Sequence, residues 1–226
     1  LKKLQSLFEN EATIRVMENE AYEEDFDIIL TTNRDVALEK AGSIFIHPLL
    51  TTKDIKKITS RIRTKKKILE NNILGQQIDH YIVRSLYSNQ IDPSELTPAK
   101  IREQMISKME KQTFVTTDFK EKVEKREQMA PTSFPSGIAI PHSIKNDALR
   151  SGVSIMTLQE PIYWNDVKVK IIALVAISKK DATEFNDFFE KFVEIVSEPI
   201  NAKRLSMAES FEEFIQKLKM MIEESE

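Results

Sequence analysis

Residues Arg126 to Ser143 read REQMAPTSFPSGIAIPHS, and the interpretation of the whole chain starts from this stretch. Its apolar segment, residues 137–140, follows a Ser-Phe-Pro-Ser turn and stops at Pro141, which predicts a short buried strand. Pro141 has no N–H to give to a sheet, so strand pairing should end there. His142 is therefore expected where a rigid strand gives way to a loop, with its imidazole held near the surface.

An imidazole in that position suits phosphoryl chemistry. A free imidazole has a pKa of about 6.5, so at neutral pH it is mostly unprotonated, and one ring nitrogen can attack a phosphoryl group and later release it. Which nitrogen reacts depends on what the other nitrogen binds, and the sequence leaves this open. By its context alone, His142 is better explained as a surface or hydrogen-bonded structural histidine, as isolated histidines usually are.

The elements Arg-Glu, Pro-Thr and Gly-Ile-Ala-Ile-Pro-His at this spacing resemble the signature of the fructose/mannitol-type enzyme IIA domain of the bacterial sugar phosphotransferase system (PTS). The segment SGVSIMTLQEPIYWNDVKVKIIALVAI, residues 151–177, continues the resemblance, which covers roughly residues 75–226. The resemblance implies that His142 accepts a phosphoryl group. It also implies that Arg126 and Thr132 lie near the phosphate.

Both of these neighbours also have a purely structural explanation. Arg126 is expected at the C-terminal end of a helix, where a cation suits the helix dipole. Its guanidinium is equally well shaped for phosphate oxygens. Thr132 can offer a hydroxyl to the site, but threonine also holds turns, and we favour the turn for this residue.

The sequence departs from the family at one position. Members carry a second histidine near the start of the helix that Asp181 should begin, and the best-matching residue here is Glu184. A carboxylate within about 5 Å of a phosphohistidine would disfavour the added charge. Glu184 could alternatively close a capping box with Asp181. The missing histidine favours a regulator, which only has to report the phosphate, over a transport component.

The N-terminal part of the chain predicts short apolar strands over residues 13–17, 27–32 and 43–47. Their long connections indicate parallel pairing. The segments DFDIILTT and SIFIHPLLTTKDIKKI resemble enzyme IIB domains, whose first strand and cysteine-bearing loop are absent here. Because the chain has no cysteine, it cannot carry out the transfer that this loop performs.

The predicted fold class is therefore α/β. A partial, parallel α/β enzyme IIB-like unit (residues 1–62) precedes a helical linker (63–76) and a mixed-sheet α/β enzyme IIA-like domain flanked by helices (77–226). Within the last two ranges, we expect helices over residues 73–86, 97–111 and 117–128 and from Asp181 and Ser210 onward. Strands are expected over 153–158 and 167–178, with a turn at Trp164, Asn165 and Asp166.

One charge cluster stands out. Lys53 to Lys67 contains eight basic residues and one acidic residue. Such a cluster can bind nucleic acid or an acidic partner. No aromatic residues interleave with the charges, however, so we favour the solvated face of a helix.

Composition excludes several classes of protein. The 226 residues are 41% hydrophobic with a net charge of −3, which indicates folded cores and argues against a protein that coats nucleic acid. No apolar run approaches about 18 residues and no signal peptide is visible, so we expect a cytoplasmic protein without a membrane span. The chain begins with Leu1, which suggests a fragment of a longer protein. Three scattered histidines and four single glycines predict no metal, nucleotide loop or cofactor.

These observations predict the phosphorylatable, sugar-sensing region of a PTS-controlled transcription regulator. The alternative is an enzyme IIA phosphocarrier of a fructose/mannitol-type transporter, and a third hypothesis is an interaction domain whose His142 is never phosphorylated. Enzymatic activity is uncertain, and a regulatory phosphohistidine domain is favoured over a catalytic one. The expected partners are the phosphocarrier protein HPr or a cognate PTS transporter domain, and upstream DNA- or RNA-binding modules of the same protein. A homodimer is a possible assembly.

Overall fold

The computed structural model describes residues 1–16, 26–39 and 43–224. The chain divides into two compact units, Leu1–Asn72 and Ile73–Glu226. This division lies within residues 63–76, the range predicted as a linker, and all of these residues belong to helix α3 (Thr52–Tyr81). The division into two compact units gives a single boundary and no separate linker. The predicted ranges 1–62, 63–76 and 77–226 therefore remain a prediction.

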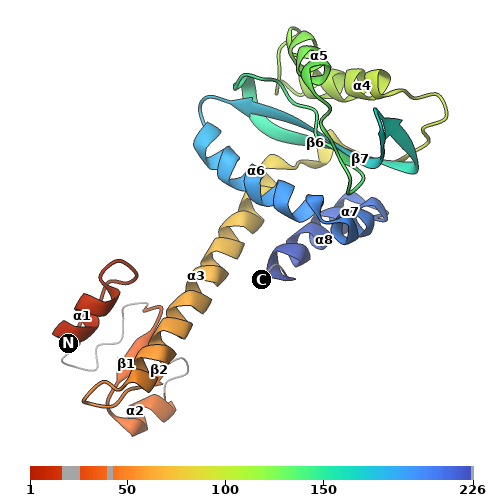
Figure 1. The fold of residues 1–226 in the computed structure, drawn as a ribbon. Helices are drawn as coiled ribbons and strands as arrows, with labels where there is room; N and C mark the ends of the chain where they lie inside the picture. The colour runs from red at the N-terminus through yellow and green to blue at the C-terminus, as the bar shows by residue number, and fades with distance from the viewer. Residues whose placement is uncertain (17–25, 40–42, 225–226) are drawn as a thin grey trace. The chain divides into compact units, whose positions relative to one another are not determined.

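The first unit is a small α/β arrangement. It contains α1 (Lys2–Phe8), β1 (Ile29–Thr31), α2 (Arg34–Glu39), β2 (Ser43–Phe45) and the beginning of α3 (Figure 1). β1 and β2 pair in parallel, as predicted. Residues 13–16 form no strand, so that prediction is wrong there, and Met17 lies outside the described residues. The buried core residues of this unit are Leu4, Phe8, Ile46, Ile58 and Ile62.

The start of α3 is fixed by one buried carboxylate. Asp54 accepts hydrogen bonds from the backbone N–H groups of His47 (3.2 Å) and Thr51 (2.8 Å) and from the Thr51 hydroxyl (2.6 Å). These bonds, the Thr51 hydroxyl first, hold the pKa of Asp54 below its usual range. Asp54 therefore satisfies donors of the incoming loop that would otherwise lack partners.

The second unit is built on a five-stranded mixed sheet of order β3-β6-β7-β5-β4. Its strands are β3 (Tyr87–Ile91), β4 (Ser133–Phe134), β5 (Ile138–Ala139), β6 (Asp147–Trp164) and β7 (Val167–Ser178). β3 is parallel to β6, β5 is parallel to β7, and the other two pairs are antiparallel. The mixed sheet confirms the predicted α/β class for this part of the chain.

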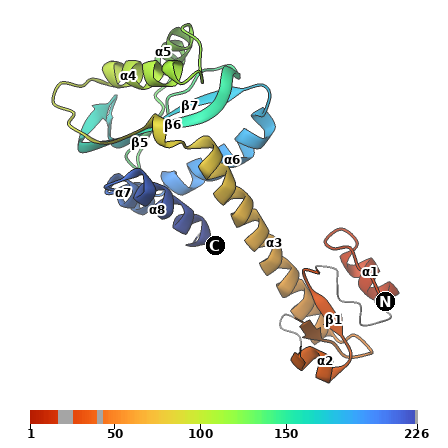
Figure 2. The same ribbon diagram turned by 180° about the vertical axis from the view of Figure 1, so that it is seen from behind.

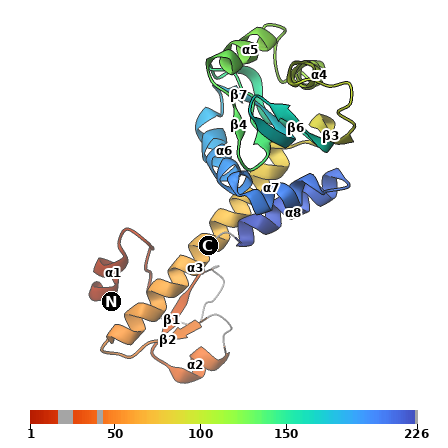
Figure 3. The same ribbon diagram turned by 45° about the vertical axis from the view of Figure 1, so that its right-hand side comes forward.

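Helices cover both faces of this sheet, as Figures 1 and 3 show, and Figure 2 shows the same layers from behind. On one face lie α4 (Pro98–Lys111) and α5 (Phe119–Met129), and on the other lie α6 (Ala182–Ser197), α7 (Pro199–Ser206) and α8 (Phe211–Glu224). Alternate side chains of β7 enter the two cores, which explains its continuous apolar sequence. Ile171, Ala173 and Val175 enter one core, and Ile172, Leu174 and Ala176 enter the other.

Local signals in the sequence account for several boundaries. Thr97 caps α4, since its hydroxyl accepts from the Lys100 N–H at 3.2 Å. Trp164 pairs with Val167 and ends β6, so the turn predicted over Trp164, Asn165 and Asp166 is confined to the last two residues. Asn165 has φ of 53°, a left-handed conformation that asparagine adopts more easily than most residues.

Some elements of the second unit were not predicted. The predicted helix over residues 73–86 is too long, because α3 ends at Tyr81 and β3 begins at Tyr87. β3 depends on pairing with β6, a distant segment that no local pattern reveals. The helix α7 was also missed, as was β4, which lies in the stretch predicted as a turn. In addition, none of the described helices is long and apolar enough to cross a membrane.

Substituting Gly152 in β6 should destabilise the second unit. A Cβ at this position would lie 2.6 Å from the ring of buried Phe114, so we expect Gly152→Ala to lower the free energy of unfolding by about 1–3 kcal/mol. Urea denaturation would measure this. The matched control is Gly75→Ala in α3, where a Cβ meets nothing within 4 Å and alanine should stabilise the helix. Equal stability of Gly152→Ala and wild type would contradict the packing at Phe114.

The Asp54 cap should give the first unit a pH-dependent stability. Because the folded pKa is lowered, the stabilisation is present above the unfolded pKa of about 3.9 and is lost as the pH falls through the folded value. At pH 7, Asp54→Ala should reduce hydrogen-exchange protection of the His47 and Thr51 amides, and acidification should remove the difference. Asp27→Ala, which truncates an exposed carboxylate, should leave these amides unchanged.

Candidate functional site

The backbone on both sides of Pro141 is fixed by the sheet. The Ile140 N–H donates to the Thr132 carbonyl at 2.9 Å, and the Val175 N–H donates to the Pro141 carbonyl at 2.9 Å. His142 forms an isolated parallel bridge with Val175. The backbone from Ile140 to His142 therefore continues the line of β5 along β7 for three more residues, and the histidine lies on a rigid support, as the sequence predicted.

The two ring nitrogens of His142 have different partners. Nδ1 lies 2.9 Å from the carbonyl oxygen of Ile140, and Nε2 lies 3.2 Å from Nε of Arg126. A carbonyl can only accept, so Nδ1 carries the hydrogen and donates it. Nε2 then holds a lone pair, which accepts from the Arg126 N–H. The His142 residue is half-buried, so part of it reaches the surface.

Arg126 comes from the last turn of α5. Besides its contact with the His142 ring, its Nη1 donates to the Ala130 carbonyl at 2.9 Å. Among the described residues it forms no ion pair with a carboxylate. Its positive charge is therefore not neutralised by a direct partner, and it lies beside the nitrogen that an anion would approach.

Thr132 is engaged elsewhere. It is buried, and its hydroxyl donates its single hydrogen to the carboxylate of Glu127. In this arrangement the hydroxyl has no hydrogen left for a phosphate. The structure brings the Thr132 backbone close to the site, through its bond with Ile140, while the side chain holds the preceding turn.

Glu127 is the glutamate of the Arg-Glu element, to which the sequence assigned no role of its own. Its side chain is only 7% exposed, and its carboxylate accepts from Thr132 and from Nε1 of Trp164 at 3.0 Å. Trp164 is itself buried. One signal was available in the sequence: a glutamate in the last turn of a helix is disfavoured by the helix dipole, so it needs compensating partners.

A second arginine holds the carboxylates of α5. Nε and Nη2 of Arg102, in α4, donate to the two oxygens of Glu124 at 2.8 and 2.6 Å, and its Nη1 lies 3.9 Å from Glu127. Its guanidinium also lies over the Trp164 ring, 5.3 Å from the centroid. Arg102 therefore provides the positive charge beside the partly exposed carboxylate of Glu124 and the buried carboxylate of Glu127.

Glu184 lies in the first turn of α6, and its side chain is exposed. Within the described residues it forms no hydrogen bond or ion pair with His142. The capping box predicted with Asp181 is wrong: Asp181 makes no side-chain cap and instead accepts from the Ser151 hydroxyl at 2.6 Å.

Burial raises the pKa of Tyr81 to about 12, and the nearby carboxylates of Glu184 and Asp181 add to this rise.

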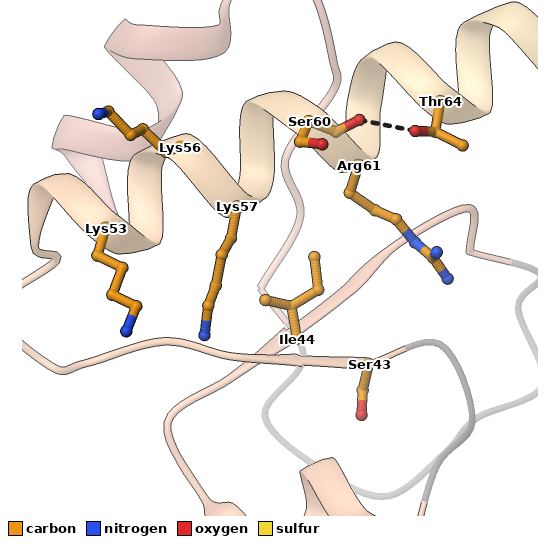
Figure 4. A pocket seen from close by; sticks show the side chains of 8 residues that line it. All are labelled: Ser43, Ile44, Lys53, Lys56, Lys57, Ser60, Arg61 and Thr64. Carbon is orange, nitrogen blue, oxygen red and sulfur yellow. Dashed lines mark hydrogen bonds between the residues drawn. The ribbon is translucent and has the colours of Figure 1, made fainter.

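Part of the basic cluster lines a hollow beside β2 in the first unit (Figure 4). The hollow has a volume of about 690 Å³, and its lining residues are Ser43, Ile44, Lys53, Lys56, Lys57, Ser60, Arg61 and Thr64. None of them is aromatic, so the hollow lacks the stacking surface that single-stranded nucleic acids use. The solvated helix face remains our prediction for this cluster.

With the geometry described, comparison with known proteins identifies the family. Residues 97–221 match the family model described as "Phosphoenolpyruvate-dependent sugar phosphotransferase system, EIIA 2". The chain belongs to this family. The match confirms the enzyme IIA part of the resemblance, whereas nothing in the comparisons identifies the first unit as enzyme IIB-like.

Two curated relatives and one solved structure illustrate the similarity. The transcriptional regulator ManR of Bacillus subtilis is 26% identical over 200 residues, which are 81% of this chain and 28% of that protein. The mannitol-specific phosphotransferase enzyme IIA component of Staphylococcus aureus is 31% identical over 115 residues, 50% of this chain and 75% of that protein. The complex of enzyme IIAMTL and phosphorylated enzyme IIBMTL from Escherichia coli has a matching chain with a TM-score of 0.52. That match has 16% identity and covers 60% of this chain and 95% of that one, so it supports the fold alone.

The arrangement of the His142 ring predicts its tautomer. In the neutral ring, the hydrogen should be on Nδ1, because Ile140 offers an acceptor there and Arg126 offers a donor at Nε2. Long-range ¹H–¹⁵N correlation spectra at a pH of about 8.5, where an ordinary imidazole is neutral, would show it. His142→Ala would assign the signals among the three histidines. A ring protonated mainly on Nε2 would contradict this geometry.

Proposed function

We propose that this chain is the phosphorylatable, sugar-sensing region of a PTS-controlled transcription regulator, and that Nε2 of His142 accepts the phosphoryl group. The observation that carries the proposal is the pair of contacts on the ring: Nδ1 is bound to Ile140, which leaves the Nε2 lone pair facing the uncompensated guanidinium of Arg126. Membership of the EIIA 2 family supports it.

The transfer step uses these residues directly. The lone pair on Nε2 attacks the phosphorus of a phosphohistidine on the donor protein; the new N–P bond forms as the donor's N–P bond breaks, and the donor imidazole leaves with that electron pair. Arg126 gives up its hydrogen bond to Nε2 and is placed to bind the phosphoryl oxygens instead. Nδ1 keeps its hydrogen bond to Ile140, which stabilises the positive charge on the ring as it develops.

Two observations favour a regulator over a transport component. The similarity to ManR extends over 81% of this chain, so it reaches beyond the second unit into the first. In addition, the position that carries a second histidine in typical members is Glu184 here. The chain spans only 28% of ManR, so the activity of the whole protein is part of the proposal.

The first unit fits this proposal as a degenerate enzyme IIB-like module. Its support is the parallel pair β1 and β2, with helices packed beside them, and the sequence resemblance. Without a cysteine it cannot pass phosphate onward by thiol chemistry. In a regulator, such a module would contact neighbouring domains in response to charge added at His142.

The proposed partners follow from the donor chemistry. HPr or a cognate PTS transporter domain would supply the phosphoryl group, and upstream DNA- or RNA-binding modules would respond to it. This function places the protein in the cytoplasm. The observation in support of the alternative, an enzyme IIA phosphocarrier, is the similarity to the S. aureus mannitol component. For that alternative the onward acceptor would be a separate enzyme IIB protein.

Phosphorylation with enzyme I, HPr and ³²P-labelled phosphoenolpyruvate tests the proposal. We expect label on the wild type and none on His142→Ala. Arg126→Gln should slow labelling by about 10²–10³-fold, as for the loss of one charged donor to a transition state. Lys125→Gln, which removes an exposed charge from the same helix turn, should label at the wild-type rate.

Three results would contradict parts of the proposal. Absence of label on the wild type would reject phosphorylation of this domain by HPr, and label that survives His142→Ala would place the phosphate on another residue. Efficient passage of the label to a mannitol-type enzyme IIB protein would favour the transport alternative.

A further inference from the structure

The candidate site closes into a ring of hydrogen bonds. Arg126 Nε donates to Nε2 of His142, and Nδ1 of the same imidazole donates to the Ile140 carbonyl. The Ile140 N–H donates to the Thr132 carbonyl, and the Thr132 hydroxyl donates to Glu127. Glu127 is the next residue after Arg126 in α5, so the peptide bond between them completes the ring.

Glu127 is the most constrained member of this ring. It lies in the last turn of α5, yet its carboxylate reaches the loop at Thr132 and the end of β6 at Trp164. A buried carboxylate at a helix C-terminus is unfavourable unless donors surround it. The Thr132 hydroxyl and the Trp164 indole, which donate to Glu127, therefore fix the distance between α5 and the loop at Thr132. α5 carries Arg126, and the Thr132 loop fixes the position of the Ile140 backbone.

The two arginines near the hydrogen-bond ring have different charge partners, and this leaves Arg126 able to bind an anion. Arg102 is placed against Glu124 and Glu127, whereas the described structure gives Arg126 no carboxylate. Glu127 thus lies beside Arg126 in sequence without neutralising it. A carboxylate directed at Arg126 would compete with an incoming phosphate for the same N–H groups.

From this geometry we infer that Glu127 is a positioning residue for phosphoryl transfer at His142. It acts through Thr132 and Ile140 to hold the imidazole as the Nδ1–H tautomer, with Nε2 at the guanidinium of Arg126. This inference rests on the proposed function. It assigns Glu127 no contact with the phosphate and no proton transfer.

Glu124 offers a matched control for the experiment. It lies one turn earlier on α5 and is also held by Arg102, but within the described residues it forms no hydrogen bond with Thr132 or Trp164. Glu127→Ala and Glu124→Ala both remove a carboxylate from Arg102, so both should lower stability in urea. Only Glu127→Ala opens the ring.

The test compares these variants by ³²P labelling through HPr and by ¹H–¹⁵N correlation spectra of His142. Glu127→Ala should slow labelling by ~10- to 100-fold and raise the fraction of the Nε2–H tautomer of His142. Both changes are expected because the imidazole is no longer held in its orientation between Ile140 and Arg126. Glu124→Ala should match the wild type in both. Glu127→Gln should recover part of the rate, since an amide can accept from Trp164 and donate to Thr132.

Thr132→Val keeps the test usable if Glu127→Ala does not fold. It opens the ring at the hydroxyl with little change of shape, and the same two changes are expected. The inference is overturned if the folded variants that open the ring match Glu124→Ala in labelling rate or in tautomer. If the wild type is not labelled at all, the proposed function fails, and the tautomer alone then decides whether Glu127 positions the imidazole.

Discussion

The pairing of residues 138–142 along β7 is the constraint on which the candidate site depends. β7 is buried on both faces and paired on both sides, so it forms a firm support for the site. Pro141 offers no N–H, but its carbonyl still accepts from Val175, which carries the alignment through to His142. The backbone that carries the imidazole is thereby fixed to the buried strand β7, although the His142 residue itself is only half-buried.

Arg102 of α4 and Arg126 of α5 differ in what their positive charges bind. Arg102 is nearly buried and is satisfied by carboxylates and by the face of an aromatic ring. Arg126 is half-buried and is satisfied only by a carbonyl and an imidazole, among the described residues. The difference comes from which acidic side chains the packing of α4 on α5 brings within reach. One cation stabilises the fold, and the other remains available to an anion.

Local patterns in the sequence predicted the elements that local physics determines. The Thr97 cap, the turn at Asn165, the apolar strand β7 and the position of His142 after a strand-ending proline all follow from neighbouring residues. Arg126 was predicted from the resemblance, and the structure places it at the ring. Glu127 was missed because its partners lie 5 and 37 residues away, and β3 was missed because its partner strand begins more than 50 residues later.

The bond between Trp164 and Glu127 has a practical consequence. This is the chain's one tryptophan, and its indole N–H is bound to the carboxylate that closes the site. Tryptophan emission responds to the polarity and charge around the indole. The protein therefore carries a native fluorophore bound to the carboxylate that closes the hydrogen-bond ring around His142, so phosphorylation of His142, if it occurs as proposed, could be followed without any dye.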